Sequence, residues 1–506
     1  MKRTRTSDLW WKTALIYCLD VETFCANGFA GLAQKVDYLS SLGVTCVWLM
    51  PYYPSPDRDD GYDITDFQAV DHRLGTLGDF VEFVRTARER GIRVIADLVV
   101  NHTSDQHPWF VEARSSRDNP YRDWYVWRDE PPADAAEGVV FPDKEKSVWE
   151  HDAKTDQYYQ HVFYKHQPDL NVANPAVRDE IARTMGLWLE LGLSGYRVDA
   201  VPFLLETESA ALPDPHDFLA DLRAFLSRRA GSAVLLGEVN LPYDQTTRFF
   251  GDPGDTGDEL TMCFDFIGMQ KMYLSLARED AGPLAEALRE RPYPPRDAHW
   301  ATFVRNHDEL TLDKLSEPER QEVFAAFGPS KDMQLYGRGL RRRLPGMLGH
   351  DLRRIKMVYS LLFSLPGTPV LFYGEEIGME EDLSREGRLA VRTPMEWDRV
   401  SDDNELLTWI RLLARRYREC PEFAWGTYEV LDTGEPAVLA HRSTADGGCV
   451  VAVHNLGSGE VELRLDGMRE PRDVLTGETE PVSADGVVSL RLGPYECRWL
   501  RVVGDD

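Results

Sequence analysis

Residues 92–97 read IRVIAD, a short run of apolar residues that ends on a carboxylate. Near-continuous apolar character over roughly four to eight residues is typical of a strand in a parallel sheet covered on both faces. Helix-like patterns separate this run from seven others of the same kind, at 13–18, 44–49, 195–200, 233–238, 260–266, 300–305 and 368–373. Eight strands alternating with helices predict an α/β fold of the (β/α)8 type, a TIM barrel.

Two parts of the chain depart from this alternation. The segment 103–174 is far longer than an ordinary βα loop and is rich in Trp, Tyr, Asp and Pro, which predicts a domain inserted after the third strand. After about residue 420, short alternating runs broken by Gly, Asp and Ser predict a C-terminal antiparallel β-sandwich. We therefore expect the barrel at 1–102 and 175–420, the inserted domain at 103–174 and the C-terminal domain at 421–506.

Charge and composition exclude several kinds of partner. The 506 residues include 57 Lys+Arg and 85 Asp+Glu, a net charge of −28, so no basic face is available for nucleic-acid phosphates or anionic lipids. No run approaches the ~20 apolar residues of a membrane helix, and no secretory signal is readable at the N-terminus. The seven cysteines include no CxxC pair, which argues against a zinc site or a disulfide framework. We expect a cytoplasmic protein with a small ligand and no nucleic-acid or membrane partner; the oligomeric state stays open.

Chemistry-bearing side chains stand at the ends of the apolar runs. In a (β/α)8 barrel these ends meet at one mouth, which here would bring Asp199, Glu238 and Asp308 together. Close carboxylates shift one another's pKa, so a fold keeps them together mainly for function. A pair of carboxyl groups, one ionised and one protonated, is what retaining cleavage of a glycosidic bond requires. The basic side chains that accompany the acids are His102, Arg197 and His307.

Other interpretations stay open at this point. A single acid that ends a strand can also be the N-cap of the next helix. A barrel can house a metal hydrolase or a Schiff-base enzyme, but these need strand-end His ligands or a strand-end Lys, and no Lys stands there. A non-catalytic relative would lack one of the carboxylates, whereas all three are present. Tyr62 could simply fill core volume.

Five stretches resemble the α-amylase family of glycoside hydrolases. DLVVNH (97–102), GYRVDAVPF (195–203), LLGEVN (235–240) and VRNHDE (304–309) resemble four of its signature regions in that family's order, and QPDLN (167–171) resembles the fifth. Further stretches, among them VRTPMEW at 391–397, resemble the trehalose synthase branch of the family. The resemblance spans nearly the whole chain and implies a barrel, an inserted domain and a C-terminal β domain.

The resemblance also implies residue roles. Asp199 would be the nucleophile that forms a β-glucosyl–enzyme intermediate, Glu238 the general acid/base, and Asp308 a group that binds hydroxyls of the distorted sugar ring. Arg197 would keep Asp199 ionised. The fork of Arg392 would clamp Asp63 at the closed end of the glucose site. The substrate-binding residues implied in this way are Tyr62, Asp63, His102, Arg197, His307 and Arg392.

The chemistry needs no cofactor, but the resemblance implies a structural calcium ion. Asn101 and Asp169 match family positions that supply oxygen ligands between the barrel and the inserted domain. Many relatives carry another metal site in the first βα loop. Here that loop reads DVETFCANGFAG (20–31) and lacks the acidic spacing, so we expect no metal there.

Three local features bear on substrate and product. Ala200 stands where relatives specific for α-1,6 linkages carry Val, which leaves room for α-1,4-linked acceptors. The segment 398–405 and the first βα loop are shorter than in trehalose synthases, which favours a more open acceptor site. We therefore expect a retaining enzyme that acts on short α-glucosides such as maltose, with hydrolysis and glucosyl transfer in competition. The alternative is a trehalose synthase proper, which isomerises maltose to trehalose in an enclosed pocket.

Overall fold

The computed structural model describes residues 9–205, 212–251, 257–445, 448–466, 468, 470–483 and 487–503. The first eight residues, on which the expectation about a secretory signal partly depends, lie outside these ranges. Within the ranges described, no helix combines the length and the apolar character needed to cross a membrane.

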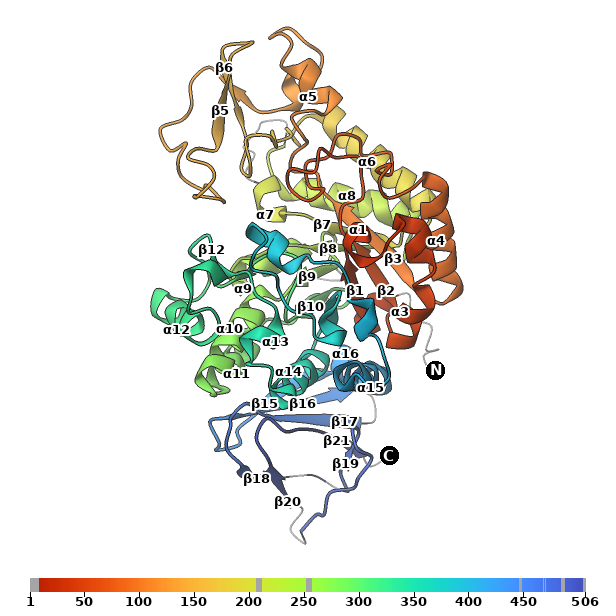
Figure 1. The fold of residues 1–506 in the computed structure, drawn as a ribbon, viewed down its shortest axis with the longest axis vertical. Coiled ribbons are helices and arrows are strands. Elements are labelled where there is room, and N and C mark those ends of the chain that lie inside the picture. The colour runs from red at the N-terminus through yellow and green to blue at the C-terminus, as the bar shows by residue number, and fades with distance from the viewer. Residues whose placement is uncertain are drawn as a thin grey trace.

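Eight parallel strands close into a barrel, so the predicted fold class is confirmed. Around the barrel they follow the order β1-β14-β10-β9-β8-β7-β3-β2, in which successive barrel strands of the chain are neighbours (Figure 1). All eight apolar runs of the sequence form barrel strands. The strands are β1 (Ile16–Leu19), β2 (Cys46–Leu49), β3 (Arg93–Leu98), β7 (Gly195–Val198), β8 (Val234–Gly237), β9 (Met262–Phe264), β10 (His299–Phe303) and β14 (Thr368–Phe372).

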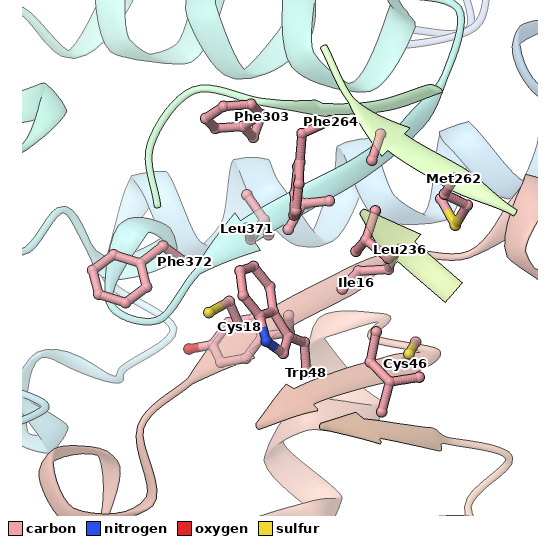
Figure 2. Packing of buried hydrophobic residues seen from close by; sticks show 14 of the residues in the cluster. Ile16, Cys18, Cys46, Trp48, Leu236, Met262, Phe264, Phe303, Leu371 and Phe372 are labelled. Atoms are coloured by element: carbon pink, nitrogen blue, oxygen red, sulfur yellow. The ribbon is translucent and has the colours of Figure 1, made fainter. Parts of the chain in front are cut away.

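Large side chains fill the barrel interior. Figure 2 shows Trp48 and Phe264 pointing toward each other, and their ring centroids lie 5.6 Å apart. Cys46 and Cys263 are fully buried in the strands β2 and β9. The indole N–H of Trp48 donates to Asp97 Oδ2 at 3.1 Å. A buried polar group costs free energy unless it is hydrogen-bonded. This hydrogen bond therefore holds the indole of Trp48 against the carboxylate of Asp97.

Helices cover the outside of the barrel (Figure 1). In α4 (Leu77–Glu89), Phe80 and Phe83 lie three residues apart on the buried face, and Thr76 and Asp79 form a capping box at its start, which satisfies N–H groups that a helix leaves unpaired. The other α-helices outside the inserted segment are α1 (Val21–Phe24), α2 (Gly28–Ala33), α3 (Val36–Leu42), α6 (Pro175–Glu190), α7 (Val201–Leu204), α8 (His216–Arg229), α9 (Tyr243–Thr246), α10 (Phe266–Arg278), α11 (Gly282–Glu290), α12 (Glu317–Phe327), α13 (Leu344–Met347), α14 (Leu352–Ser364), α15 (Glu405–Glu419) and α16 (Pro421–Trp425).

The segment between β3 and α6 folds over the barrel as a small unit of its own (Figure 1). It contains α5 (Pro108–Ala113) and a sheet of order β4-β6-β5, formed by β4 (Trp127–Arg128), β5 (Trp149–Asp152) and β6 (Gln157–Gln160). Phe110 packs against Tyr125, Trp127 and Tyr159, with ring centroids 5.0 to 5.7 Å away. These four aromatic side chains therefore form a core for the segment.

A second small sheet, which the sequence did not predict, follows β10. Its order is β11-β13-β12, and its strands are β11 (Leu310–Thr311), β12 (Gln334–Leu335) and β13 (Gly339–Leu340). These strands have two residues each. They are too short to carry a readable pattern of alternation.

Antiparallel sheets follow α16, as predicted. One has the order β15-β16-β17-β21-β19 and the other pairs β18 with β20. The sequence did not predict β19 and β21. In β21, Trp499 belongs to the core shared with the barrel and Leu500 to the core between the two sheets, so both faces are buried and alternation is lost. The strands are β15 (Thr427–Leu431), β16 (Val438–Ala445), β17 (Gly448–Asn455), β18 (Val461–Asp466), β19 (Arg472–Asp473), β20 (Val487–Leu492) and β21 (Cys497–Val503).

Candidate active site

One buried arginine organises the acids at the mouth of the barrel. Arg197, in β7, is 1% exposed. Its Nη1 donates to Asp97 Oδ1 at 2.6 Å and to Asp199 Oδ1 at 2.5 Å, and its Nη2 donates to Glu238 Oε2 at 2.7 Å. Two of the predicted acids are therefore held by the two terminal nitrogens of one guanidinium. The planar fork of arginine suits this multidentate arrangement.

The backbone after β7 fixes the direction of Asp199. The strand ends at Val198, and Ala200 adopts a left-handed conformation with φ of 48° before α7 begins. The Ala200 N–H donates to Glu238 Oε2 at 3.1 Å, which couples the turn to the second acid. A β-branched side chain at position 200 would be strained in this conformation, so the backbone favours the Ala that the sequence has there.

Burial and neighbouring charges separate the pKa values of these two acids. Burial raises the pKa of Glu238 to about 7; Arg197 opposes the rise, and the charges of Asp199 and Asp308 add to it. Burial raises the pKa of Asp199 to about 6, although Arg197 favours the ionised form. The acid with the higher pKa is suited to donate a proton, and the other to act as an ionised nucleophile.

The third acid sits in a cationic environment. Asp308 Oδ1 accepts from Arg392 Nη2 at 3.0 Å and lies 2.9 Å from Arg388 Nη1. Its Oδ2 lies 3.2 Å from His307 Nε2. Burial opposes ionisation, but the charges of Arg388 and Arg392 outweigh it and lower the pKa of Asp308. The environment of Asp308 therefore favours its ionised form.

Tyr62 connects two sides of the mouth. Its hydroxyl donates to Asp97 Oδ2 at 3.2 Å and lies 2.7 Å from His307 Nε2. Its ring stacks on that of His307 with centroids 5.7 Å apart. His102 Nε2 lies 3.2 Å from the carbonyl oxygen of Tyr62. Burial lowers the pKa of His102 to about 3 and that of His307 well below its usual range, so both imidazoles are neutral.

The expected clamp between Arg392 and Asp63 is wrong. Asp63 is fully buried; it accepts from Ser55 Oγ at 2.7 Å and from Arg58 Nε at 3.0 Å. Arg392 Nη1 instead donates to Asp60 Oδ2 at 2.5 Å. Asp63 therefore holds the loop after β2 in shape, and the structure does not bring it into the acid cluster.

Three further residues at the mouth escaped the sequence analysis: Asp60, Glu309 and Arg388. Arg388 lies in the 3-10 helix η6 (Gly387–Val391), four residues before Arg392. Residues three apart share a face of a 3-10 helix, so the spacing of four gives no periodic signal that could have found it. Glu309 follows the third acid directly and binds Arg388 Nε at 2.8 Å.

The residues implied for calcium come together without fitting the ion. Asn101 Nδ2 donates to Asp169 Oδ1 at 3.1 Å, and Asp169 Oδ2 accepts from the Val162 N–H at 3.0 Å. The two side chains thus bond to each other between the barrel and the inserted segment. Calcium takes six to eight oxygen ligands, and in the part of the chain that the structure describes no group of three or more His, Cys, Asp or Glu could hold a metal.

Comparison with known proteins identifies relatives that cover most of the chain. The sequence model of the alpha amylase catalytic domain matches residues 25–321, and that of the sucrose hydrolase-like C-terminal domain matches residues 447–501. Trehalose synthase/amylase TreS of Mycolicibacterium smegmatis is 40% identical over 509 aligned residues, which cover 90% of this chain and 85% of that protein. Trehalose synthase of Pimelobacter sp. is 36% identical, covering 98% of this chain and 96% of that protein.

A solved structure shares the fold over nearly the whole chain. An α-glucosyl transfer enzyme superposes with a TM-score of 0.79 at 25% identity, covering 97% of this chain and 99% of that one. Fold and sequence together define an enzyme that processes glycosidic bonds. The chain belongs to the α-amylase family.

Proposed function

We propose that this protein is a retaining enzyme that removes a terminal glucosyl unit from short α-glucosides such as maltose and passes it to water or to a second sugar. The observation that carries the proposal is the bonding of Asp199 and Glu238 to the two ends of the Arg197 guanidinium. A single side chain thereby keeps the two carboxyl groups close, as retention requires.

In the first step, the ionised Asp199 attacks the anomeric carbon of the glucosyl ring. The bond from that carbon to the leaving oxygen breaks, and Glu238 transfers its proton to the oxygen, which leaves as a hydroxyl. In the second step, the Glu238 carboxylate takes a proton from water or from an acceptor hydroxyl. The oxygen so activated attacks the anomeric carbon and releases Asp199. Two inversions at one carbon give net retention.

The surrounding residues would bind the ring that reacts. Asp308 is ionised and would accept hydrogen bonds from sugar hydroxyls, which strengthen as the ring distorts. His102 and His307 are neutral and would donate hydrogen bonds. Arg392 would position Asp308, which it contacts at 3.0 Å, and Tyr62 would close the inner end of the site. Asp63, whose carboxylate accepts from Ser55 and Arg58, would lie at the closed end of the same site.

The pKa values predict a narrow bell-shaped pH profile. Activity should rise as Asp199 ionises near pH 6 and fall as Glu238 loses its proton near pH 7, because the nucleophile must be ionised and the acid protonated. The two groups interact, so the two apparent pKa values of the profile belong to the pair and not to either residue alone. The measurement is kcat/KM against pH with maltose, whose sugar leaving group needs the proton of Glu238. In Glu238→Gln the alkaline limb should disappear while the acid limb stays; a wild-type rate that keeps rising above neutral pH would contradict the assignment.

Hydrolysis and transfer are both supported by the relatives. The relative from Mycolicibacterium smegmatis is named for both synthase and amylase activities, and the solved structure is that of an α-glucosyl transfer enzyme. The shortened segment 398–405 supports an acceptor site that water can reach. With maltose, we therefore expect free glucose and α-linked transfer products together, with the α configuration retained in the first product detected by NMR. If maltose gives mainly trehalose and little free glucose, the protein is instead a trehalose synthase proper.

The remaining expectations complete the proposal. The reaction requires no cofactor, and the donor set around Asn101 and Asp169 speaks against the structural calcium ion that the resemblance implied. A cytoplasmic location is supported by seven cysteines that are free, six of them buried, because disulfides are rare in reducing compartments. We further propose the domain division 1–102 with 175–420 as the barrel, 103–174 as the inserted domain and 421–506 as the C-terminal domain, with sugars as the only partners.

A further inference from the structure

Arg388 reaches across the mouth from η6. Its Nη1 lies 2.9 Å from Asp308 Oδ1 and its Nε donates to Glu309 Oε2 at 2.8 Å. The guanidinium also lies over two aromatic rings, 5.0 Å from the centroid of Phe141 and 5.9 Å from that of Tyr336. These partners come from the inserted segment, from the loop after β10 and from the turn between β12 and β13.

Three basic side chains crowd the Asp308 carboxylate. Its Oδ1 accepts from Arg392 Nη2 at 3.0 Å and lies 2.9 Å from Arg388 Nη1, and its Oδ2 lies 3.2 Å from His307 Nε2. A carboxylate accepts about four hydrogen bonds, but a sugar hydroxyl that binds Oδ1 has to share this oxygen with the two arginines. The side chain most easily displaced is the one that has the most contact with solvent and that keeps other partners when it moves away.

The three donors differ in their freedom to move. His307 is fully buried and stacks on Tyr62. Arg392 is 2% exposed; its Nε donates to the carbonyl oxygen of His307 at 2.8 Å and its Nη1 to Asp60. The side chain of Arg388 is 21% exposed. If it leaves Asp308, it still keeps Glu309 and both rings.

We propose that Arg388 is the gate of the glucosyl site. Without sugar it occupies Asp308; when the ring enters, it yields that carboxylate to the sugar hydroxyls and stays on Glu309 between Phe141 and Tyr336. There it forms the wall that separates the glucosyl–enzyme from bulk water on the acceptor side. This inference rests on the proposed function, because it concerns which acceptor reaches the intermediate.

Arg338 offers a matched control. Its Nη2 donates to Glu309 Oε1 at 3.3 Å and its Nη1 to the carbonyl oxygen of Val140 at 2.8 Å. It therefore shares Glu309 and the inserted segment with Arg388, and no contact between Arg338 and Asp308 is present among the described residues. If Arg388 only held the inserted segment in place, replacing Arg338 should have the same effect as replacing Arg388.

The test measures where the glucosyl unit goes. With p-nitrophenyl α-glucoside as donor and isotope-labelled glucose as acceptor, p-nitrophenol counts all turnovers and labelled disaccharide counts transfers. In Arg388→Ala the ratio of transfer to hydrolysis should fall about tenfold, the effect expected for losing a charged hydrogen-bonding group, while the KM for the donor does not rise. Arg338→Ala should keep the wild-type ratio. Arg388→Lys keeps the charge but cannot bond two carboxylates with a rigid fork, so its ratio should fall as well.

Several outcomes would overturn the inference. These are a wild-type ratio in Arg388→Ala, an equal fall in Arg338→Ala, or a donor KM that rises in Arg388→Ala. Thermal melting of each variant shows whether a change in the ratio comes from loss of folding. If Arg388→Ala does not fold, the transfer ratio of Arg388→Lys is the test, and a wild-type ratio in that variant contradicts the inference. If the wild-type protein releases no p-nitrophenol, the proposed function fails. If it turns the donor over normally and only the ratio is insensitive to Arg388, the gate alone is wrong.

Discussion

Replacing Asp199 by Ala should lower turnover of maltose by about five orders of magnitude, the scale of loss seen when a catalytic nucleophile is removed. The fold should survive, because Arg197 keeps Asp97 and Glu238 as partners. Steady-state rates measure the first effect and thermal melting the second. Wild-type activity in Asp199→Ala would show that Asp199 is not the nucleophile.

Azide gives this variant a sharper signature than the loss of rate. A small anion can enter the space that the carboxylate leaves and attack the anomeric carbon from the same side. With an activated donor such as α-glucosyl fluoride, Asp199→Ala should then form β-glucosyl azide. Rescue that yields the α product instead would contradict attack from the Asp199 side.

Replacing Glu238 by Gln should produce a loss that depends on the leaving group. For maltose, whose sugar leaving group needs a proton, we expect a fall of about four orders of magnitude, at the upper end of general acid catalysis. For p-nitrophenyl α-glucoside, whose leaving group departs without help, the first step should be nearly unaffected and the glucosyl–enzyme should accumulate. A burst of p-nitrophenol followed by slow turnover is the expected trace.

The matched comparison uses Glu238→Ala with azide and the same aryl donor. Asp199 still forms the β-linked intermediate, so azide should attack from the opposite face and give α-glucosyl azide. Opposite anomers from the Asp199 and Glu238 variants would distinguish the two roles by chemistry rather than by rate. Equal losses for maltose and for the aryl donor in Glu238→Gln would show that Glu238 is not the acid.

The barrel and its three acids could be predicted because both depend on regular features of parallel strands. Strands buried on both faces read as apolar runs, and parallel strand ends meet at one mouth, so Asp199 and Glu238 follow from β7 and β8. The same argument reaches Asp308 through β10. The C-terminal strand β21 was missed because its two faces pack against different cores, which removes the alternation used to find sheet strands.

The partner of Arg392 could not be predicted because it depends on a loop. Asp57, Asp60 and Gly61 have positive φ values of 62°, 51° and 91°, so the chain reverses direction several times between β2 and Asp63. Such a turn decides which of two acids three residues apart meets the arginine, and it has no periodic signal. Arg388 was missed for a similar reason, since its position depends on how η6 folds back over the mouth.

The central claim is a covalent glucosyl bond to Asp199, and the most direct measurement of it is mass spectrometry of the trapped intermediate. A fluorinated α-glucosyl fluoride slows both steps but forms the intermediate faster than it is hydrolysed. Digestion of the trapped protein should yield one peptide, containing Asp199, that is heavier by one fluoroglucosyl residue, and Asp199→Ala should yield none. A label on Glu238 or Asp308, or turnover of the reagent without any labelled peptide, would contradict the account.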